Sequence, residues 1–273
     1  YCKTCVISNQ RPSSVIEFKN KPSDKKTTIN FDDDGICSAC RYAEIKQSIN
    51  WDEREKSLID LCDKYRSSDG SYDCIIPGSG GKDSAFTAHV LKYKYGMNPL
   101  TVTWSPHVYT DIGWRNFRSW IDSGLDNMLY SPNGKLHRLL TQLAFKNLVH
   151  PFQPFIIGQR LVGPRFSMLY NIPLVFYGEN QAEYGNNISE NESPKMDMSF
   201  FYNSSIGIDD LHLGGVSATK LIDKYNVNIN DLNPYMPLNV EKLKSVGTEV
   251  HYLGYYLKWD PQECFYYAAE NTG

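Results

Sequence analysis

Three glycines, two serines, a lysine and an aspartate stand together in the segment IIPGSGGKDSAF (75–86). Main-chain N–H groups of neighbouring glycines can line an anion-sized hollow, and glycines let a phosphate come close because they carry no Cβ. Lys82 adds a full positive charge, and Ser79 and Ser84 add hydroxyl donors. Asp83 offers an oxygen ligand suited to the Mg²⁺ that accompanies a nucleoside triphosphate. These residue types predict a polyphosphate-binding loop made of Gly78, Ser79, Gly80, Gly81, Lys82, Asp83 and Ser84.

The place of this loop in the chain strengthens the prediction. An apolar run (72–77) ends directly before the loop, and a helical pattern (82–96) begins within it. A helix N-terminus carries a partial positive charge, so the helix and the main chain would both attract the anion. Neither the Walker spacing nor the dinucleotide spacing G-x-G-x-x-G can be laid on these residues. On residue types alone, an ordinary glycine-rich turn remains the alternative.

Four of the seven cysteines form two C-x-x-C pairs. Cys2 and Cys5 make the first pair, and Cys37 and Cys40 make the second. Four thiolates from two such pairs can bind one Zn²⁺ tetrahedrally. The polar segment between the pairs has few large apolar residues, so a metal ion would account for its folding. An iron–sulfur centre is the alternative.

A third polar stretch, YGENQAEYG (177–185), follows a strand-like run. Glu179, Asn180 and Glu183 carry side chains that can bind a metal ion or a polar substrate. Because an acidic turn is often only solvated, this stretch by itself is weaker evidence than the glycine loop.

The elements that must position these residues alternate between strand and helix patterns. Strand-like runs fall at 72–77, 99–104, 125–131 and 172–178, and helical patterns fall at 52–66, 82–96, 112–124, 135–149 and 157–171. This alternation predicts an α/β fold with a parallel twisted sheet and helices on both faces. The later stretch EVHYLGYYLKWDPQECFYYAAE predicts a further strand followed by a helix.

The domain division follows from these patterns. Residues 1–50 are predicted to form a zinc-ribbon-like module, and residues 51–273 the α/β domain. From 185 to 235 the periodicity is lost, and the stretch GNNISENESPKMDMSFFYNSS (185–205) is typical of an insertion or lid more than of a core element. Because the chain starts at Tyr1 and stops without an obvious helix end, we expect part of the natural protein, including C-terminal sequence, to be absent.

Composition excludes several classes of protein. Apolar residues make up 41% and charged residues 22%, as in an ordinary globular protein, and the net charge of −3 argues against a wide nucleic-acid surface. No apolar run reaches the roughly 20 residues that span a bilayer, and no signal-peptide pattern is present. An odd number of cysteines argues against a disulfide framework, so we predict a cytoplasmic protein. Cys62, Cys74 and Cys264 lie in apolar patterns and are expected to be packing residues.

The set S-G-G-K-D-S resembles the SGGxDS loop of the PP-loop ATP pyrophosphatases, which include the asparagine, GMP and NAD synthetases and the tRNA thiolases. The resemblance implies an adenine nucleotide alpha-hydrolase-like fold and cleavage of ATP between its α and β phosphates. The loop would hold the pyrophosphate, with catalytic roles for Lys82, Asp83 and Glu183. By the same analogy Thr103 and Trp104, at the end of the second strand, would border the adenine.

The combination of YCKTCV, DDDGICSACR, IIPGSGGKDS, GENQAEYG and YLGYYLKWDPQE is similar to the N-acetyl sugar amidotransferases of bacterial lipopolysaccharide and flagellin-glycan biosynthesis. That resemblance implies a ligase that uses ATP and Mg²⁺ to adenylylate an N-acetyl carbonyl oxygen. Ammonia then replaces this oxygen, giving an acetamidino group, AMP and pyrophosphate. The implied substrate is an N-acetylated nucleotide sugar or nonulosonic acid. Because the sequence shows no convincing glutaminase triad, the expected partner is a separate glutaminase subunit that supplies the ammonia. From the charge and composition we expect no nucleic acid and no membrane partner. Segment 11–36 is longer than the family's usual connection.

Two alternatives stay open. A tRNA thiolase also carries C-x-x-C pairs ahead of this loop, but it needs further reactive cysteines in its core, and the three remaining cysteines are unpaired in sequence. The second alternative is a nucleotide-binding module without catalysis. The presence of Lys82, Asp83 and Glu183 favours an enzyme over such a module.

Overall fold

A computed structural model of the chain describes residues 1–10, 12–13, 15–184, 193–202 and 207–273. Its centre is a five-stranded sheet in the order β3-β2-β1-β4-β7, with every neighbouring pair parallel. The strands are β1 (Cys74–Pro77), β2 (Pro99–Trp104), β3 (Asp126–Tyr130), β4 (Leu174–Tyr177) and β7 (Glu249–Tyr252). The predicted parallel α/β fold class is confirmed.

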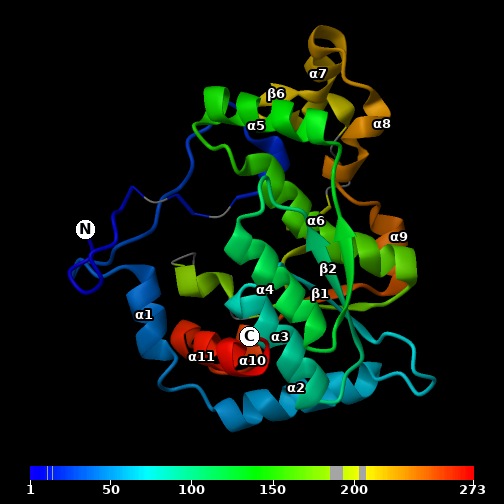
Figure 1. Cartoon of the computed structure of the whole chain (residues 1–273). Helices are drawn as coiled ribbons and strands as arrows, with labels where there is room; N and C mark the ends of the chain where they lie inside the picture. Colours follow the sequence, from blue (N-terminus) through cyan, green and yellow to red (C-terminus); the bar gives the residue numbers. More distant parts are fainter. Residues whose placement is uncertain (11, 14, 185–192, 203–206) are drawn as a thin grey trace.

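Helices cover both faces of this sheet (Figure 1). Buried side chains on one face come from α5 (Gly134–Leu148), α6 (Gln153–Tyr170), α7 (Ala218–Tyr225) and α9 (Val240–Val246). Those on the other face come from α2 (Trp51–Tyr65), α3 (Lys82–Tyr93), α4 (Asp111–Asp122), α10 (Leu253–Tyr256) and α11 (Pro261–Asn271). Neighbouring residues of β1 serve different faces, since Ile75 belongs to the first core and Ile76 to the second. Among the described helices, none has the length and apolar character needed to cross a membrane.

Helix α6 differs most from its predicted bounds, because it begins at Gln153 rather than at 157. Pro154 lies in its first turn, where a missing N–H costs no helical hydrogen bond. Gly158 serves packing, since a Cβ there would lie 2.0 Å from Cε2 of Trp104. The glycine therefore lets α6 lie close against the end of β2.

The segment 185–235, which lacks periodicity in the sequence, contains core elements in its described part. Of the stretch 185–205, expected to be an insertion or lid, the structure describes 193–202, and Phe201 there is 1% exposed in the core. Leu213, Leu221 and Tyr235 are fully buried in the core beside α5 and α6. The elements here are short, namely η5 (Ile208–Asp210), β5 (His212–Leu213), β6 (Val216–Ser217), α7, α8 (Ile229–Leu232) and η6 (Asn233–Tyr235). Periodicity does not detect such elements because it needs a longer window. Residues 185–192 and 203–206 of this segment lie outside the described residues.

The N-terminal region contributes to the main core as well as to the cysteine cluster. Phe18, in η1 (Glu17–Lys19), is 1% exposed and packs in the core on the α6 side. Nε2 of Gln153 donates a hydrogen bond of 2.8 Å to the carbonyl of Glu17. The cysteine-bearing ends form a separate small cluster around Cys2, Ile29 and Cys37. The division at residue 50 stays a prediction.

The three remaining cysteines are packing residues, as predicted. Cys62, Cys74 and Cys264 are buried in the core on the α3 side of the sheet. Burial raises the pKa of the Cys62 and Cys264 thiols to about 12, so both are protonated at neutral pH. Neither thiol is poised as a nucleophile.

A buried histidine on the opposite side gives the fold a pH dependence. His137 of α5 is 7% exposed, and its Nδ1 lies 2.7 Å from the hydroxyl of Tyr235. The ring centroid of His107 lies 4.6 Å away. Burial, together with the charge of His107, lowers the pKa of His137 from 6.5 to about 4.

We predict that His137 makes the fold less stable as the pH falls from 6.5 towards 4. In that window the unfolded chain binds a proton on this imidazole and the folded chain does not. Lowering the pH from 7 to 5 should cost about 2 kcal/mol through this residue. Urea unfolding of the wild type and His137→Gln at both pH values measures the effect. Equal pH dependence in the two proteins would contradict the prediction.

Candidate functional site

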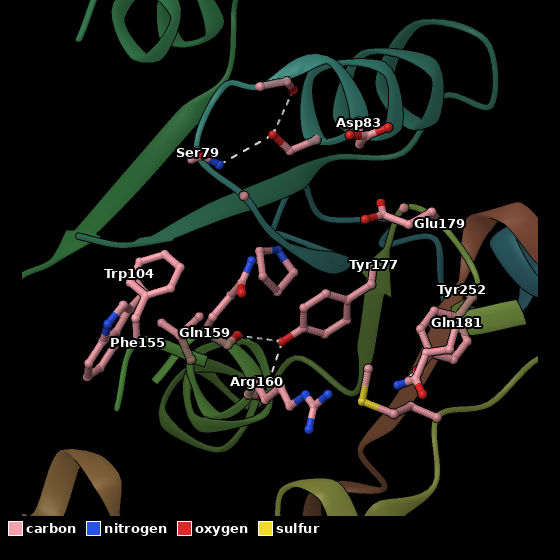
Figure 2. Close-up of a pocket in the computed structure, with 17 residues that line it drawn as sticks. Ser79, Asp83, Trp104, Phe155, Gln159, Arg160, Tyr177, Glu179, Gln181 and Tyr252 are labelled. Carbon is pink, nitrogen blue, oxygen red and sulfur yellow. Dashed lines mark hydrogen bonds between the residues drawn. The ribbon is translucent and has the colours of Figure 1, made fainter. Parts of the chain in front are cut away.

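The hydroxyl of Ser84 closes the glycine loop, which lies where β1 ends and α3 begins (Figure 2). Its Oγ accepts hydrogen bonds from the N–H of Ser79 at 3.3 Å and from the N–H of Gly80 at 3.1 Å. The same hydroxyl donates to the carbonyl of Gly81 at 3.0 Å. The loop thus has a fixed shape without any bound ligand.

The free N–H groups of this loop lie further along the chain than the sequence indicated. The N–H of Gly78 donates to the carbonyl of Val102 at 2.9 Å, and those of Ser79 and Gly80 are taken by Ser84. In the described part of the chain, the N–H groups of residues 81–84 donate no hydrogen bond to any acceptor. These are the first N–H groups at the start of α3, which have no partner within a helix and attract anions.

Gly80 and Gly81 are glycines for different reasons. Gly80 has a φ of +81°, and a Cβ there would lie 2.6 Å from the carbonyl oxygen of Asn116. Gly81 has an ordinary φ of −68°, and the nearest atom to a Cβ there would be Oγ of Ser79 at 3.8 Å. The fold therefore needs Gly80, whereas at Gly81 the fold itself would admit a side chain. The space beside Gly81 is open to a ligand.

A cavity of about 340 Å³ opens beside this loop. Its volume falls in the range of small-molecule sites, roughly 300–1000 Å³. Figure 2 shows the loop on one side of the cavity and α6 with Tyr177 and Tyr252 on the other. The lining residues are Pro77, Gly78, Ser79, Gly81, Asp83, Ser84, Trp104, Phe155, Gln159, Arg160, Val162, Tyr177, Gly178, Glu179, Gln181, Met196 and Tyr252.

Of the two predicted charged loop residues, only Asp83 lines the cavity. The ammonium of Lys82 lies 2.6 Å from Oδ1 of Asp83, and both side chains are partly exposed. Lys82 instead borders a surface hollow with Pro261, Gln262 and Phe265. Because Lys82 and Asp83 neutralise each other, the positive potential at the start of α3 comes mainly from the main-chain N–H groups.

Of the two residues predicted to border the adenine, Trp104 lines the cavity and Thr103 does not. Thr103 is fully buried, and its Oγ1 accepts a hydrogen bond of 2.9 Å from Nδ2 of Asn127 in β3. Trp104 is 4% exposed and stacks on Tyr130, with ring centroids 5.3 Å apart. Neighbouring strand residues point to opposite faces, which is why the two side chains separate.

Of the three predicted residues in the polar stretch after β4, only one lines the cavity. Glu179 lines the cavity, whereas Asn180 is fully buried and its Oδ1 accepts a hydrogen bond of 3.1 Å from the N–H of Ala182. Glu183 lies outside the cavity lining and forms an ion pair of 2.8 Å with Lys46. The roles predicted for Asn180 and Glu183 at the substrate stay predictions. Gly185, at the end of this stretch, lies outside the described residues.

Sequence reasoning missed most of the residues on the far side of the cavity. The sequence does lead us to expect that aromatic residues of 234–267 border the sugar pocket, and Tyr252 of that stretch lines the cavity. Tyr177 and Tyr252 are the last residues of β4 and β7, and the carboxyl ends of parallel strands meet at one edge of the sheet. That rule could have found them. Gln159 and Arg160 lie in the middle of α6, where no local pattern marks them. Their place depends on how α6 crosses the sheet.

The ion pair of Lys46 and Glu183 joins three segments of the chain. Lys46 ends α1 (Ser38–Ile45), and Glu183 lies in η2 (Gln181–Tyr184). Nζ of Lys46 also donates a hydrogen bond of 2.6 Å to the carbonyl of Trp259, before α11. The side chains are 10% and 15% exposed. Burial raises the pKa of Glu183, although Lys46 opposes this shift.

We predict that Lys46→Met destabilises the protein by about 3 kcal/mol, because it leaves the Glu183 carboxylate buried without its cation. The double variant Lys46→Met/Glu183→Leu should recover much of that loss, since neither charge remains. Urea unfolding at pH 7 of the wild type and both variants measures these free energies. If Lys46→Met were as stable as the double variant, the ion pair of Lys46 and Glu183 would not contribute to stability, and the prediction would be contradicted.

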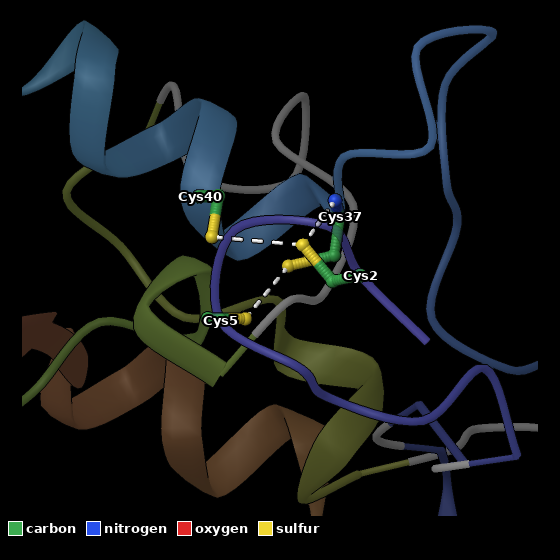
Figure 3. A group of neighbouring side chains, drawn as sticks. All are labelled: Cys2, Cys5, Cys37 and Cys40. Carbon is green, nitrogen blue, oxygen red and sulfur yellow. Dashed lines mark hydrogen bonds between the residues drawn. The ribbon is translucent and has the colours of Figure 1, made fainter.

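The four cysteines predicted to bind a metal come together (Figure 3). All four sulfur atoms lie within 4.8 Å of one another. The Cys2–Cys40 pair of sulfurs is 3.9 Å apart, and the Cys5–Cys37 pair is 3.6 Å apart. Zinc–sulfur bonds of about 2.3 Å in a tetrahedron place the sulfurs about 3.8 Å apart. The cluster therefore has the dimensions of a site for one Zn²⁺.

The surroundings of Cys2 favour the thiolate that such a metal requires. Burial acts to raise its pKa, but main-chain N–H groups pointing at the sulfur outweigh burial and lower the pKa to about 6. Cys37 donates at 3.3 Å and Thr4 at 3.4 Å. N–H donors around a cysteine sulfur are outer-shell contacts that stabilise a bound metal.

We predict that the purified protein carries one Zn²⁺ per chain. Cys5→Ser should lower the zinc content and the midpoint of thermal unfolding, because the N-terminal region loses its crosslink. Cys264→Ala removes a buried thiol elsewhere and should keep the zinc. Elemental analysis by mass spectrometry reads the metal directly. Iron with acid-labile sulfide in place of zinc would refute the prediction.

Comparison with known proteins gives limited likenesses. No family model matches the chain. The uncharacterized protein MJ1599 of Methanocaldococcus jannaschii is 34% identical over 80 residues, which is 29% of this chain and only 28% of the relative. The crystal structure of NAD+ synthetase from Burkholderia pseudomallei aligns with a TM-score of 0.32 and 15% identity, covering 88% of this chain and 97% of that chain. Neither likeness assigns an activity to this chain.

Proposed function

We propose that this chain is an ATP-dependent, AMP-forming ligase of the PP-loop ATP pyrophosphatase type. The observation that carries the proposal is the start of α3, where the N–H groups of residues 81–84 meet no acceptor in the described chain and border an open cavity. A polyphosphate would satisfy these donors at the helix N-terminus. The sequence SGGKDS lies at this turn.

The cavity offers a place for each part of the nucleotide. The β and γ phosphates of ATP would lie at the glycine loop, and the ring of Trp104 would form an aromatic wall beside the adenine base. Asp83 and Glu179 are the carboxylates that line the cavity, and they would hold Mg²⁺. When bound, this ion neutralises charge on the phosphates. The fixed loop amides would stabilise the pyrophosphate as it leaves, without having to reorganise.

The proposed reaction is the conversion of an N-acetyl group of a bacterial surface sugar into an acetamidino group. An amide carbonyl is a poor electrophile, so its oxygen first attacks the α phosphorus of ATP and pyrophosphate leaves. Ammonia then attacks the activated carbon, and AMP leaves with the former carbonyl oxygen. A separate glutaminase subunit in the cytoplasm would supply the ammonia. The motif combination of the five segments quoted above supports this choice of substrate.

The position of the cysteines favours nitrogen over sulfur transfer. A thiolase needs a reactive cysteine near the nucleotide, but Cys62, Cys74 and Cys264 are buried in the core, and none lines the cavity. In the described residues the other cysteines all belong to the metal cluster. A tRNA thiolase is therefore the weaker candidate.

The reaction can be tested by its products. The protein is incubated with ATP, Mg²⁺, ammonium and UDP-N-acetylglucosamine or N-acetylneuraminate, and nucleotides are separated by chromatography. We expect AMP and pyrophosphate, and a sugar product in which an imino nitrogen replaces the carbonyl oxygen, seen by mass spectrometry. ADP and phosphate as products would refute the proposal, as would incorporation of sulfur into tRNA.

We further predict that Gly81→Val lowers AMP formation by at least about tenfold, because its side chain would occupy the space meant for phosphate. The fold should tolerate this change, since only Ser79 Oγ lies within 4 Å of the added Cβ. Gly134→Val is the matched control, at another helix start where an added Cβ meets nothing within 4 Å. Unchanged activity in Gly81→Val would show that the phosphates bind elsewhere.

A further inference from the structure

A second cavity of about 500 Å³ adjoins the one at the glycine loop. The two cavities share Gln181, Met196 and Tyr252 as a common wall. The second cavity has both polar and aromatic lining, which suits a ring with hydroxyl groups. Its lining residues are Val15, Ile16, Gln181, Ser193, Lys195, Met196, Asp197, Ser199, Phe200 and Tyr252.

Arg160 stands where the two cavities meet. It lines the first cavity, and Nη1 of its guanidinium donates a hydrogen bond of 2.7 Å to the carbonyl of Val15 in the second. Its guanidinium carbon lies 4.6 Å from the ring centroid of Phe200, also in the second cavity. Figure 2 shows Arg160 across the cavity from Ser79 and Asp83. The guanidinium therefore lies on the side of the first cavity opposite the glycine loop and next to the second cavity.

Arg160 forms no ion pair in the described chain, although the buried carboxylate of Glu17 acts on its charge from a longer distance. None of the carboxylates in residues 1–10, 12–13, 15–184, 193–202 and 207–273 lies within ion-pair distance of it. The other cation of this region, Lys195, is paired with Glu249 at 2.9 Å. Burial lowers the pKa of Arg160, but a guanidinium stays protonated in proteins. A half-buried cation that forms no ion pair favours an anionic ligand.

We propose that the second cavity binds the acceptor substrate, and that Arg160 binds a carboxylate or phosphate group of that substrate. The planar guanidinium can hold either group through two parallel hydrogen bonds. The rings of Phe200 and Tyr252 would pack against the sugar ring. The shared wall lets the acceptor extend into the first cavity, where the nucleotide would be bound. This inference rests on the proposed function and adds where the acceptor binds and that Arg160 recognises its anionic group.

Calorimetric titration tests the proposal on the full chain, saturated with a non-hydrolysable ATP analogue and Mg²⁺. The probes are UDP-N-acetylglucosamine for the phosphate source, N-acetylneuraminate for the carboxylate source, and neutral N-acetylglucosamine as the control sugar. Arg160→Gln should weaken the binding anionic probe by at least about tenfold, since a charge-assisted pair is lost. Whichever anion responds identifies the source.

A second variant keeps the test informative if Arg160→Gln folds poorly. Ser199 lines only the second cavity, so Ser199→Trp should fill that space and block the same anionic probe, while the ATP analogue still binds. An anionic probe that binds both variants as well as the wild type overturns the inference, and so does a wild type that binds neither anion. A wild type that fails to bind the ATP analogue refutes the proposed function itself.

Discussion

The site depends on the hydroxyl group of Ser84, which forms hydrogen bonds with main-chain groups of the glycine loop. Ser84 accepts from two loop N–H groups and donates to one carbonyl, so the loop keeps its shape with no ligand present. Because those bonds use the earlier N–H groups, the donors left over are the ones at the start of α3. A fixed set of donors costs little to reorganise when charge develops on a leaving group. The rigidity of the loop and its proposed use therefore have the same origin.

The edge of the sheet brings the other walls of the cavity to this loop. β1, β4 and β7 are neighbours that run parallel, so their carboxyl ends place residues far apart in sequence around one space. Gly78 comes after β1, Tyr177 ends β4 and Tyr252 ends β7. This is the usual place for ligands in open parallel sheets. Helix α6 closes the space because Gly158 lets it approach β2.

The buried and half-buried charges around the cavities differ in whether they are paired. The Lys46–Glu183 pair is complete, and it fastens the segment that carries the cysteine cluster to the stretch after β4. Arg160 is half-buried without such a partner, and it faces the cavities. The difference matters because a paired charge needs no further ligand, whereas an unpaired one is stabilised by an incoming anion. The residue types of Glu183 and Arg160 alone do not reveal this difference in pairing.

The sequence by itself determined the glycine loop, the two C-x-x-C pairs, the alternating elements and the parallel sheet, because each of these is encoded in residues close together in the chain. It also led to Asp83, Trp104 and Glu179 on the cavity. Only the tertiary structure decided that Thr103 lies outside the cavity lining and that Glu183 pairs with Lys46. It also decided that 207–235 packs into the core and that Arg160 lies between two cavities. These outcomes depend on which faces of distant segments meet, and the periodicity of one segment carries no information about its neighbour's face.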